Sequence, residues 1–126
     1  MIIKEYKNKT VLKGMNMDEL TQWFRENEHP LFRAQQIYQW MYRHGITIGT
    51  DMSNISKKLQ KDLEENCILN TLSIEKINSS KNEPTQKILF RTIDNHFIEA
   101  VSMVEGSRHT ICISSQIGCN VDCDFC

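Results

Sequence analysis

Four of the five cysteines of this 126-residue chain lie within its last fifteen positions. Cys119, Cys123 and Cys126 form a C-x3-C-x2-C pattern, which Cys112 precedes by seven residues. Three thiolates from one short loop can hold three irons of a 4Fe–4S cluster and leave the fourth iron without a protein ligand. Tetrahedral zinc instead prefers two pairs of ligands, and His109 or Cys112 would complete such a set only by folding back. Chance clustering of structural cysteines is a third reading, so the spacing favours an open iron–sulfur cluster.

The composition predicts a cytosolic globular protein of one ordinary domain or two small ones. No run approaches the ~18 apolar residues that span a bilayer, and the first residues lack the apolar stretch of an export signal. An odd number of cysteines in such a chain favours metal or redox chemistry over a disulfide scaffold. The net charge of −1 indicates neither nucleic acid nor membrane as a partner, although positions 1–62 are mildly basic and positions 63–126 acidic.

The elements that must position these cysteines begin with three short helices. Asn16, with Glu19 in the capping-box position, predicts a helix over 17–27. A second helix is expected over 31–44, and Ser56 caps a third. The core of this helical unit is expected to contain Trp23, Phe24, Ile37, Trp40 and Met41.

Beyond about Asn70, β-branched residues alternate with polar ones, which is typical of strands. Asp94 and Asn95 tolerate positive φ and therefore suit a two-residue hairpin turn. The expected strands are 71–77, 86–93, 96–104 and 110–114.

Several segments resemble one enzyme family. The cysteine pattern with Phe125 before its third cysteine is similar to the signature of radical S-adenosylmethionine (SAM) enzymes. Its lead-in at 110–119, TICISSQIGC, resembles that of the RlmN adenine-C2 methyltransferases and their relative Cfr. FRAQQIYQW at 32–40, MSNISK at 52–57 and FIEAV at 97–101 resemble further RlmN motifs in the same order. The likeness covers nearly the whole chain, and the two helical motifs look closer to RlmN than to Cfr.

The resemblance implies a cofactor set and a role for each matching residue. Cys119, Cys123 and Cys126 would ligate a 4Fe–4S cluster, whose open iron binds S-adenosylmethionine. A second cysteine in the C-terminal region of such enzymes carries a methyl group that is transferred to adenine C2. Cys112 matches the resolving cysteine, which releases the base by forming a transient disulfide, and Glu99 matches the residue that transfers a proton at the adenine.

Physical reasoning alone supports these two roles only in part. Burial in a cleft would raise the pKa of Glu99 toward a useful value, whereas a glutamate in a strand is more often an ordinary exposed residue. Cys112 stands between two isoleucines, where a cysteine is more often a small buried hydrophobe than a nucleophile.

The resemblance also implies partners: 23S rRNA and tRNA as substrates and an electron donor such as flavodoxin. We expect a monomer without membrane contact. Basic side chains could touch RNA phosphates, although a run of charge is usually just a solvated face. The candidate RNA contacts are Arg33, Arg43, Lys57, Lys58 and Lys61. No motif includes Cys67, expected to be structural, or His29, His44, His96 and His109, expected at the surface or in turns.

The sequence therefore predicts an α+β fold in three parts. Positions 1–69 form a three-helix RNA-binding accessory domain, and 70–113 form a small antiparallel sheet carrying Glu99 and Cys112. Positions 114–126 form the cluster loop at the start of a truncated radical SAM (βα) barrel. Because relatives of this kind run more than twice as long, we expect a front piece that does not complete the reaction alone. A stand-alone RNA- or zinc-binding module and a Cfr-like adenine-C8 methyltransferase remain alternatives.

Overall fold

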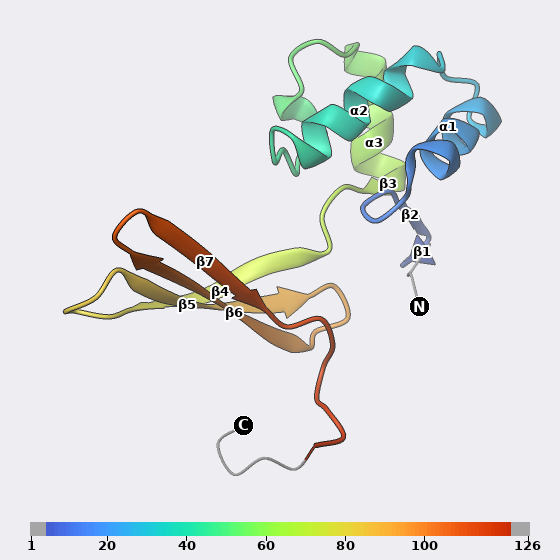
Figure 1. The fold of residues 1–126 in the computed structure, drawn as a ribbon. Coiled ribbons are helices and arrows are strands. Elements are labelled where there is room, and N and C mark those ends of the chain that lie inside the picture. The colour runs from blue at the N-terminus through green and yellow to red at the C-terminus, as the bar shows by residue number, and fades with distance from the viewer. Residues whose placement is uncertain (1–4, 122–126) are drawn as a thin grey trace. The chain divides into compact units, whose positions relative to one another are not determined.

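The computed structural model describes residues 5–121 of the chain, which divides into two compact units, Met1–Thr71 and Leu72–Cys126. Within the described residues the fold is α+β with three α-helices, as the sequence predicts, and it contains two small sheets where the sequence predicts one (Figure 1). The boundary falls two residues after the predicted one. The predicted start of a barrel, 114–126, extends beyond the described residues, and its described part is a loop.

The three predicted helices are α1 (Met17–Glu26), α2 (Phe32–Tyr42) and α3 (Lys57–Asn66). The capping box of α1 is complete. The Glu19 N–H donates to Asn16 Oδ1 at 2.9 Å, and the Asn16 N–H donates to Glu19 Oε2 at 3.0 Å. The Ser56 hydroxyl oxygen caps α3 by accepting from the Leu59 N–H at 3.3 Å.

The first unit also contains a sheet that the sequence analysis missed. Strand β1 (Glu5–Tyr6) pairs antiparallel with β2 (Lys9–Val11), and β2 pairs parallel with β3 (Cys67–Ile68). A short 3-10 helix, η1 (Gly49–Asp51), lies between α2 and α3. Strands of two or three residues are too short to show a period, so the purely helical interpretation of this unit was wrong.

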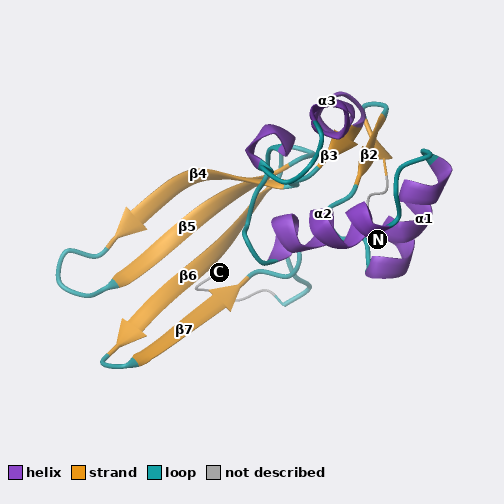
Figure 2. Cartoon of the chain, turned by 90° about the horizontal axis from the view of Figure 1, so that it is seen from above, coloured by secondary structure: helices purple, strands orange, loops and turns teal. Residues whose placement is uncertain are grey.

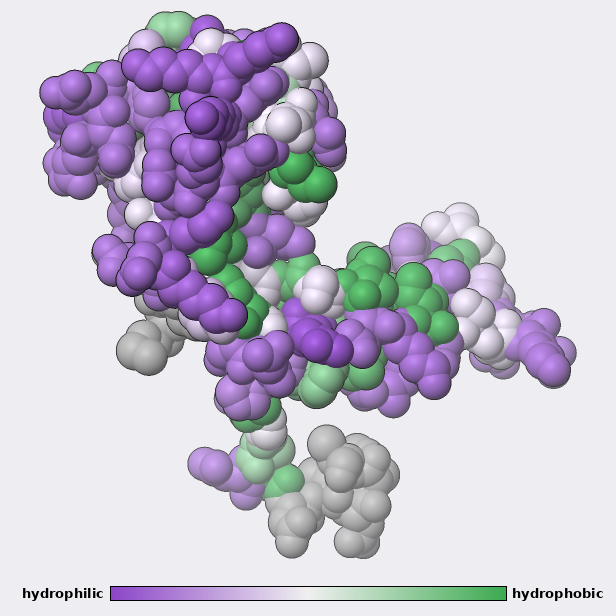
Figure 3. Space-filling model, turned by 180° about the vertical axis from the view of Figure 1, so that it is seen from behind, coloured by the Kyte–Doolittle hydropathy of each residue, from purple (hydrophilic) through white to green (hydrophobic). Residues whose placement is uncertain are grey.

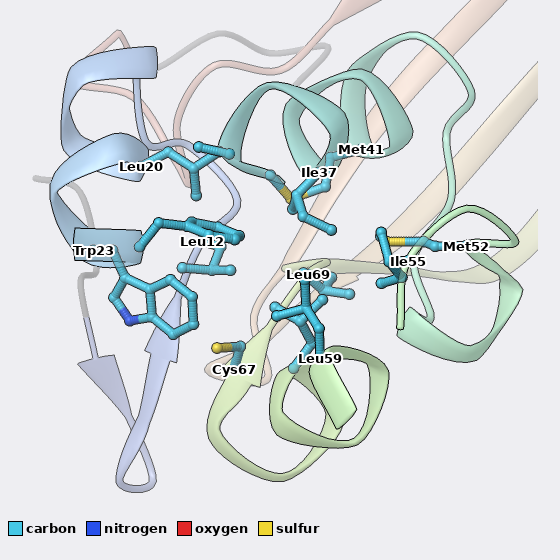
Figure 4. Packing of buried hydrophobic residues seen from close by; sticks show 13 residues of the cluster. Leu12, Leu20, Trp23, Ile37, Met41, Met52, Ile55, Leu59, Cys67 and Leu69 are labelled. Atoms are coloured by element: carbon cyan, nitrogen blue, oxygen red, sulfur yellow. The ribbon is translucent and has the colours of Figure 1, made fainter. Parts of the chain in front are cut away.

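The helices and β3 enclose one apolar core (Figure 4). Four of the five predicted core residues are buried, whereas Trp40 is only partly buried and packs against the cluster. Cys67 is buried within it, and that burial, with a smaller contribution from Asp62, raises the pKa of its thiol to about 12. A neutral, buried thiol agrees with the structural role expected for Cys67. The core residues labelled in Figure 4 all belong to this buried cluster: Leu12, Leu20, Trp23, Ile37, Met41, Met52, Ile55, Leu59, Cys67 and Leu69.

The second unit is an antiparallel meander of four strands (Figure 2). Its strands are β4 (Leu72–Ser79), β5 (Thr85–Thr92), β6 (Phe97–Glu105) and β7 (Arg108–Ile113). They begin and end within a few residues of the four predicted strands.

The turn between β5 and β6 is longer than predicted. Four residues separate Thr92 from Phe97, and the Thr92 N–H donates to the His96 carbonyl oxygen at 2.8 Å. Asn95 has the positive φ, 63°, that the sequence analysis expected Asp94 and Asn95 to tolerate. The Thr92 hydroxyl donates to Asp94, and this bond, assisted by His96, lowers the pKa of the Asp94 carboxyl.

The two faces of this sheet differ in polarity. Because side chains alternate along a strand, Ile88, Ala100 and Ile113, which pair across β5, β6 and β7, share one face. That face is apolar, and a groove of about 460 Å³ lies against it. Apolar side chains along the sheet remain visible at the surface (Figure 3), and Ile111 and Ile113 are more than half exposed. The opposite face carries the charged residues described next.

Candidate functional site

Glu99 lies in the middle of β6 and points to the polar face of the sheet. It stands opposite Leu89 of β5, and its side chain is 48% exposed. The Lys87 ammonium, one diagonal position away on β5, lies 2.9 Å from Glu99 Oε1. Glu99 is therefore a half-exposed, ion-paired carboxylate and not the buried acid that a closed cleft would contain. Sequence reasoning missed Lys87, because the pairing of β5 with β6 is what brings it to Glu99.

Cys112 lies on the same face of the sheet. It stands directly opposite Val101, two residues from Glu99 along β6. The Ser114 N–H donates to the Glu99 carbonyl oxygen at 3.1 Å, so the pairing continues past the end of β7. Glu99 and Cys112 are thus diagonal neighbours on adjacent strands, with a typical separation of roughly 7–8 Å. The Cys112 thiol is exposed, so the interpretation of Cys112 as a small buried hydrophobe was wrong.

The cysteine cluster falls only partly within the described residues. Cys119 is exposed in the loop after β7, and its sulfur accepts from the Val121 N–H at 3.2 Å. Gly118 before it has φ 69°, a left-handed conformation that favours glycine. Cys123 and Cys126 lie outside the described residues. Within 5–121, no group of three His, Cys, Asp or Glu side chains lies close enough together to hold a metal ion.

His109, one candidate for completing a zinc site, is engaged within the sheet. Its Nε2 lies 2.7 Å from the Ser102 hydroxyl oxygen. By register this pair belongs to the apolar face, opposite to Cys112. The fold thus places the two candidates for a fourth zinc ligand, His109 and Cys112, on opposite faces of the sheet.

The two helical motifs meet in space at Asn54. The Arg33 guanidinium donates to the Asn54 carbonyl oxygen at 2.6 Å, and the Trp40 indole N–H donates to Asn54 Oδ1 at 2.6 Å. The guanidinium also lies 4.7 Å from the centre of the Phe32 ring. Arg33, a predicted RNA contact, therefore joins α2 to the loop before α3.

The remaining predicted RNA contacts are exposed, but their surroundings carry both signs of charge. Lys58 and Lys61 line a hollow of about 390 Å³ together with Glu28, Asp62 and Glu65. The Lys61 ammonium lies 3.6 Å from Glu65 Oε1. This hollow therefore lacks the uniform positive charge of a phosphate site. Arg43 and Lys57 are exposed at the end of α2 and the start of α3.

His29, expected at the surface or in a turn, follows the turn after α1 and is partly buried beside the same hollow. Its side chain is 14% exposed, its Nε2 lies 2.6 Å from Asp62 Oδ2, and its ring stacks on Trp23 with the ring centres 5.8 Å apart. The sequence did not predict this partner, because an isolated histidine after a helix carries no signal for a distant residue on α3.

Known proteins resemble the chain over most of its length. The family model of the ribosomal RNA large subunit methyltransferase N-terminal domain matches residues 10–69. The chain is 40% identical over 115 residues to the dual-specificity RNA methyltransferase RlmN of Geobacter sulfurreducens, covering 91% of this chain and 32% of that protein. It is 40% identical over 120 residues to the probable dual-specificity RNA methyltransferase RlmN of Clostridioides difficile, covering 95% and 35%.

The chain is also similar to a solved structure. The crystal structure of a radical SAM methyltransferase from Sphaerobacter thermophilus matches with a TM-score of 0.83 and 34% identity, over 92% of this chain and 34% of that one. The chain thus spans about a third of the length of these relatives. No described helix is long and apolar enough to cross a membrane.

Proposed function

We propose, from the premise that this chain belongs to the RlmN family, that it forms the N-terminal part of a radical SAM enzyme that methylates adenine C2 in 23S rRNA and tRNA. The observation that carries the proposal is that Glu99 and Cys112 occupy one exposed face of adjacent strands. A proton-transferring carboxylate and a nucleophilic thiol can reach the same substrate only if they share a surface.

The donor set at the end of the sheet fits an iron–sulfur cluster. Cys119, Cys123 and Cys126 supply three thiolates, and the exposed Cys119 sulfur already accepts a backbone N–H, a bond typical of cluster sulfurs. When bound, a 4Fe–4S cluster with S-adenosylmethionine supplies the radical chemistry that activates a methyl group. The three cysteines, which follow the end of β7 by six to thirteen positions in the sequence, would hold this cofactor.

Two residues of the sheet would act on the substrate adenine. The Glu99 carboxylate, half exposed and held by Lys87, would accept or return a proton at the base. The Cys112 thiolate would attack the sulfur of a second cysteine supplied by the remaining part of the enzyme. A sulfur–sulfur bond then forms, the carbon–sulfur bond to the base breaks with its electron pair moving to carbon, that carbon takes up a proton to become the methyl group, and the methylated base is released.

The helical unit would serve as the RNA-binding accessory domain. Arg43, Lys57 and Lys58 are exposed and could approach phosphates, whereas Arg33 would support the surface through its bond to Asn54. We propose adenine C2 and not C8 as the target because the 32–40 and 52–57 motifs resemble RlmN. An electron donor such as flavodoxin would supply the reducing electron, and the enzyme would act as a monomer in the cytoplasm.

The experiment joins this chain to the C-terminal two thirds of the Geobacter sulfurreducens relative and expresses the fusion in a bacterium without its own adenine-C2 activity. Mass spectrometry of rRNA nucleosides is expected to find 2-methyladenosine with the fusion, and none after Cys112→Ala or Cys119→Ala. Only 8-methyladenosine would refute the C2 assignment. Stoichiometric zinc without iron after anaerobic purification, together with no methylation, would refute the proposed function.

A further inference from the structure

The reaction outlined above gives Lys87 no effect on the Cys112 thiol, although both residues lie on the candidate face. Lys87 stands opposite Val101, and Val101 stands opposite Cys112, so the three residues form one row across β5, β6 and β7. Two strand spacings of about 4.8 Å separate Lys87 from Cys112 along this row. The Lys87 ammonium lies 2.9 Å from Glu99 Oε1. A cation, a carboxylate and a thiol therefore share one small area of the sheet.

This arrangement reduces an electrostatic repulsion between the two groups that act in the proposed reaction. A thiolate that reacts at Cys112 would stand beside the Glu99 carboxylate, and two negative charges at this separation repel each other. A positive charge next to the carboxylate offsets that repulsion. It also fixes the carboxylate on the strand face, since a free glutamate side chain samples several rotamers.

We propose that Lys87 is a positioning residue that holds the Glu99 carboxylate and offsets its negative charge at the Cys112 sulfur. The part played in the resolving step rests on the proposed function. The electrostatic part is a property of this sheet, and the 126-residue chain is sufficient to test it.

The test measures the charge around the Cys112 sulfur with two disulfide reagents. Dithiobis(nitrobenzoate) carries two negative charges and 4,4′-dithiodipyridine is neutral, so the ratio of their reaction rates reports the local potential and not the accessibility of the thiol. Replacing Cys119, Cys123 and Cys126 by serine leaves Cys112 and the buried Cys67, whose pKa is raised to about 12. A further Cys112→Ser change shows the background reaction.

Lys87→Met is expected to lower the ratio of anionic to neutral rate about threefold at low salt, from one charge at roughly 10 Å in water. Lys87→Arg should keep the original ratio, and adding Glu99→Gln to Lys87→Met should restore it. Arg91→Met is the matched control, because Arg91 makes a comparable exposed pair with Glu75 at 2.8 Å farther along the same face. It should change the ratio much less.

An unchanged ratio in Lys87→Met, or an equal fall in Arg91→Met, would overturn the inference. The fusion enzyme separates this failure from failure of the proposed function. If the fusion methylates adenine but Lys87→Met leaves the ratio of anionic to neutral reaction rates unchanged, the enzyme assignment stands and the role of Lys87 is refuted. If Lys87→Met lowers the ratio as expected but the fusion does not methylate adenine, the electrostatic effect of Lys87 stands and its role in the reaction is refuted.

Discussion

The buried thiol of Cys67 makes the stability of the helical unit depend on pH. Burial raises its pKa from the ordinary value of 9.0 to about 12, so the folded unit retains the proton that the unfolded chain loses. The sign follows from this difference. The stabilisation is fully present below about pH 9 and is lost as the pH rises toward 12, because the unfolded state alone releases its proton in that window.

The size of the loss follows from the two pKa values. A single proton changes the free energy of unfolding by at most about 1.4 kcal/mol per pH unit, which gives a fall of about 2 kcal/mol between about pH 8 and about pH 10.5. Urea unfolding followed by tryptophan fluorescence reports on this unit alone, since Trp23 and Trp40 both belong to it. Cys67→Ala provides the comparison, because the variant has no thiol to titrate.

The wild-type chain should lose stability with pH more steeply than Cys67→Ala, and the difference between the two curves isolates the thiol from lysines and tyrosines. Asp62→Asn should reduce the wild-type slope slightly, because the Asp62 charge contributes to the raised pKa of Cys67. Parallel curves for the wild-type chain and Cys67→Ala would refute the reasoning, since they would show that the thiol is no harder to ionise in the folded unit.

Three further changes test the packing and the turns. Leu63→Ala removes a fully buried side chain of α3 and should lower the free energy of unfolding by about 2–5 kcal/mol in urea titrations, whereas a loss below that range would mean that the site collapses around the gap. Asn54→Ala leaves the Trp40 indole N–H without its acceptor and should cost about 1 kcal/mol, with exposed Gln35→Ala as the control that should cost nothing measurable. Asn95→Val places a β-branched residue at φ 63° and should destabilise the sheet by about 1–2 kcal/mol, seen as a lower melting temperature. Asn95→Gly should not destabilise it, because glycine adopts positive φ readily. Equal losses in the two variants would contradict the turn argument.

The helices were predictable because their signals are local. The Asn16 and Glu19 capping box occupies four consecutive positions, and the structure contains both of its hydrogen bonds. Strands β1 and β3 were not predictable, because each is only two residues long. In addition, β3 pairs with β2, which is far from it in the sequence. The burial of His29 was hidden for the same reason, since its partner Asp62 is 33 positions away. Contacts of this kind depend on the tertiary fold and leave no period in the sequence.

The alternating pattern of the strands predicts only part of the candidate site. Alternation along β6 places Glu99 and Val101 on one face, and this much follows from the sequence. Whether Cys112 joins them depends on the turn between β6 and β7, where Glu105 pairs with Arg108. Gly106 and Ser107 form this two-residue turn, and Gly106 supplies the positive φ, 58°, at its first central position.

The turn at Gly106 therefore determines the register of β7 and the face of the sheet on which Cys112 lies. If the two-residue turn were kept, one residue inserted at the start of β7 would shift the register by one position and move Cys112 to the apolar face, opposite to Glu99. Two residues inserted in this way would keep the face but move Cys112 one row farther along β6. The Lys87 row would then pair with a different residue of β7, and the cation would no longer be aligned with the thiol. A short glycine turn that carries no reactive group thus sets the positions of the carboxylate, the cation and the thiol relative to one another.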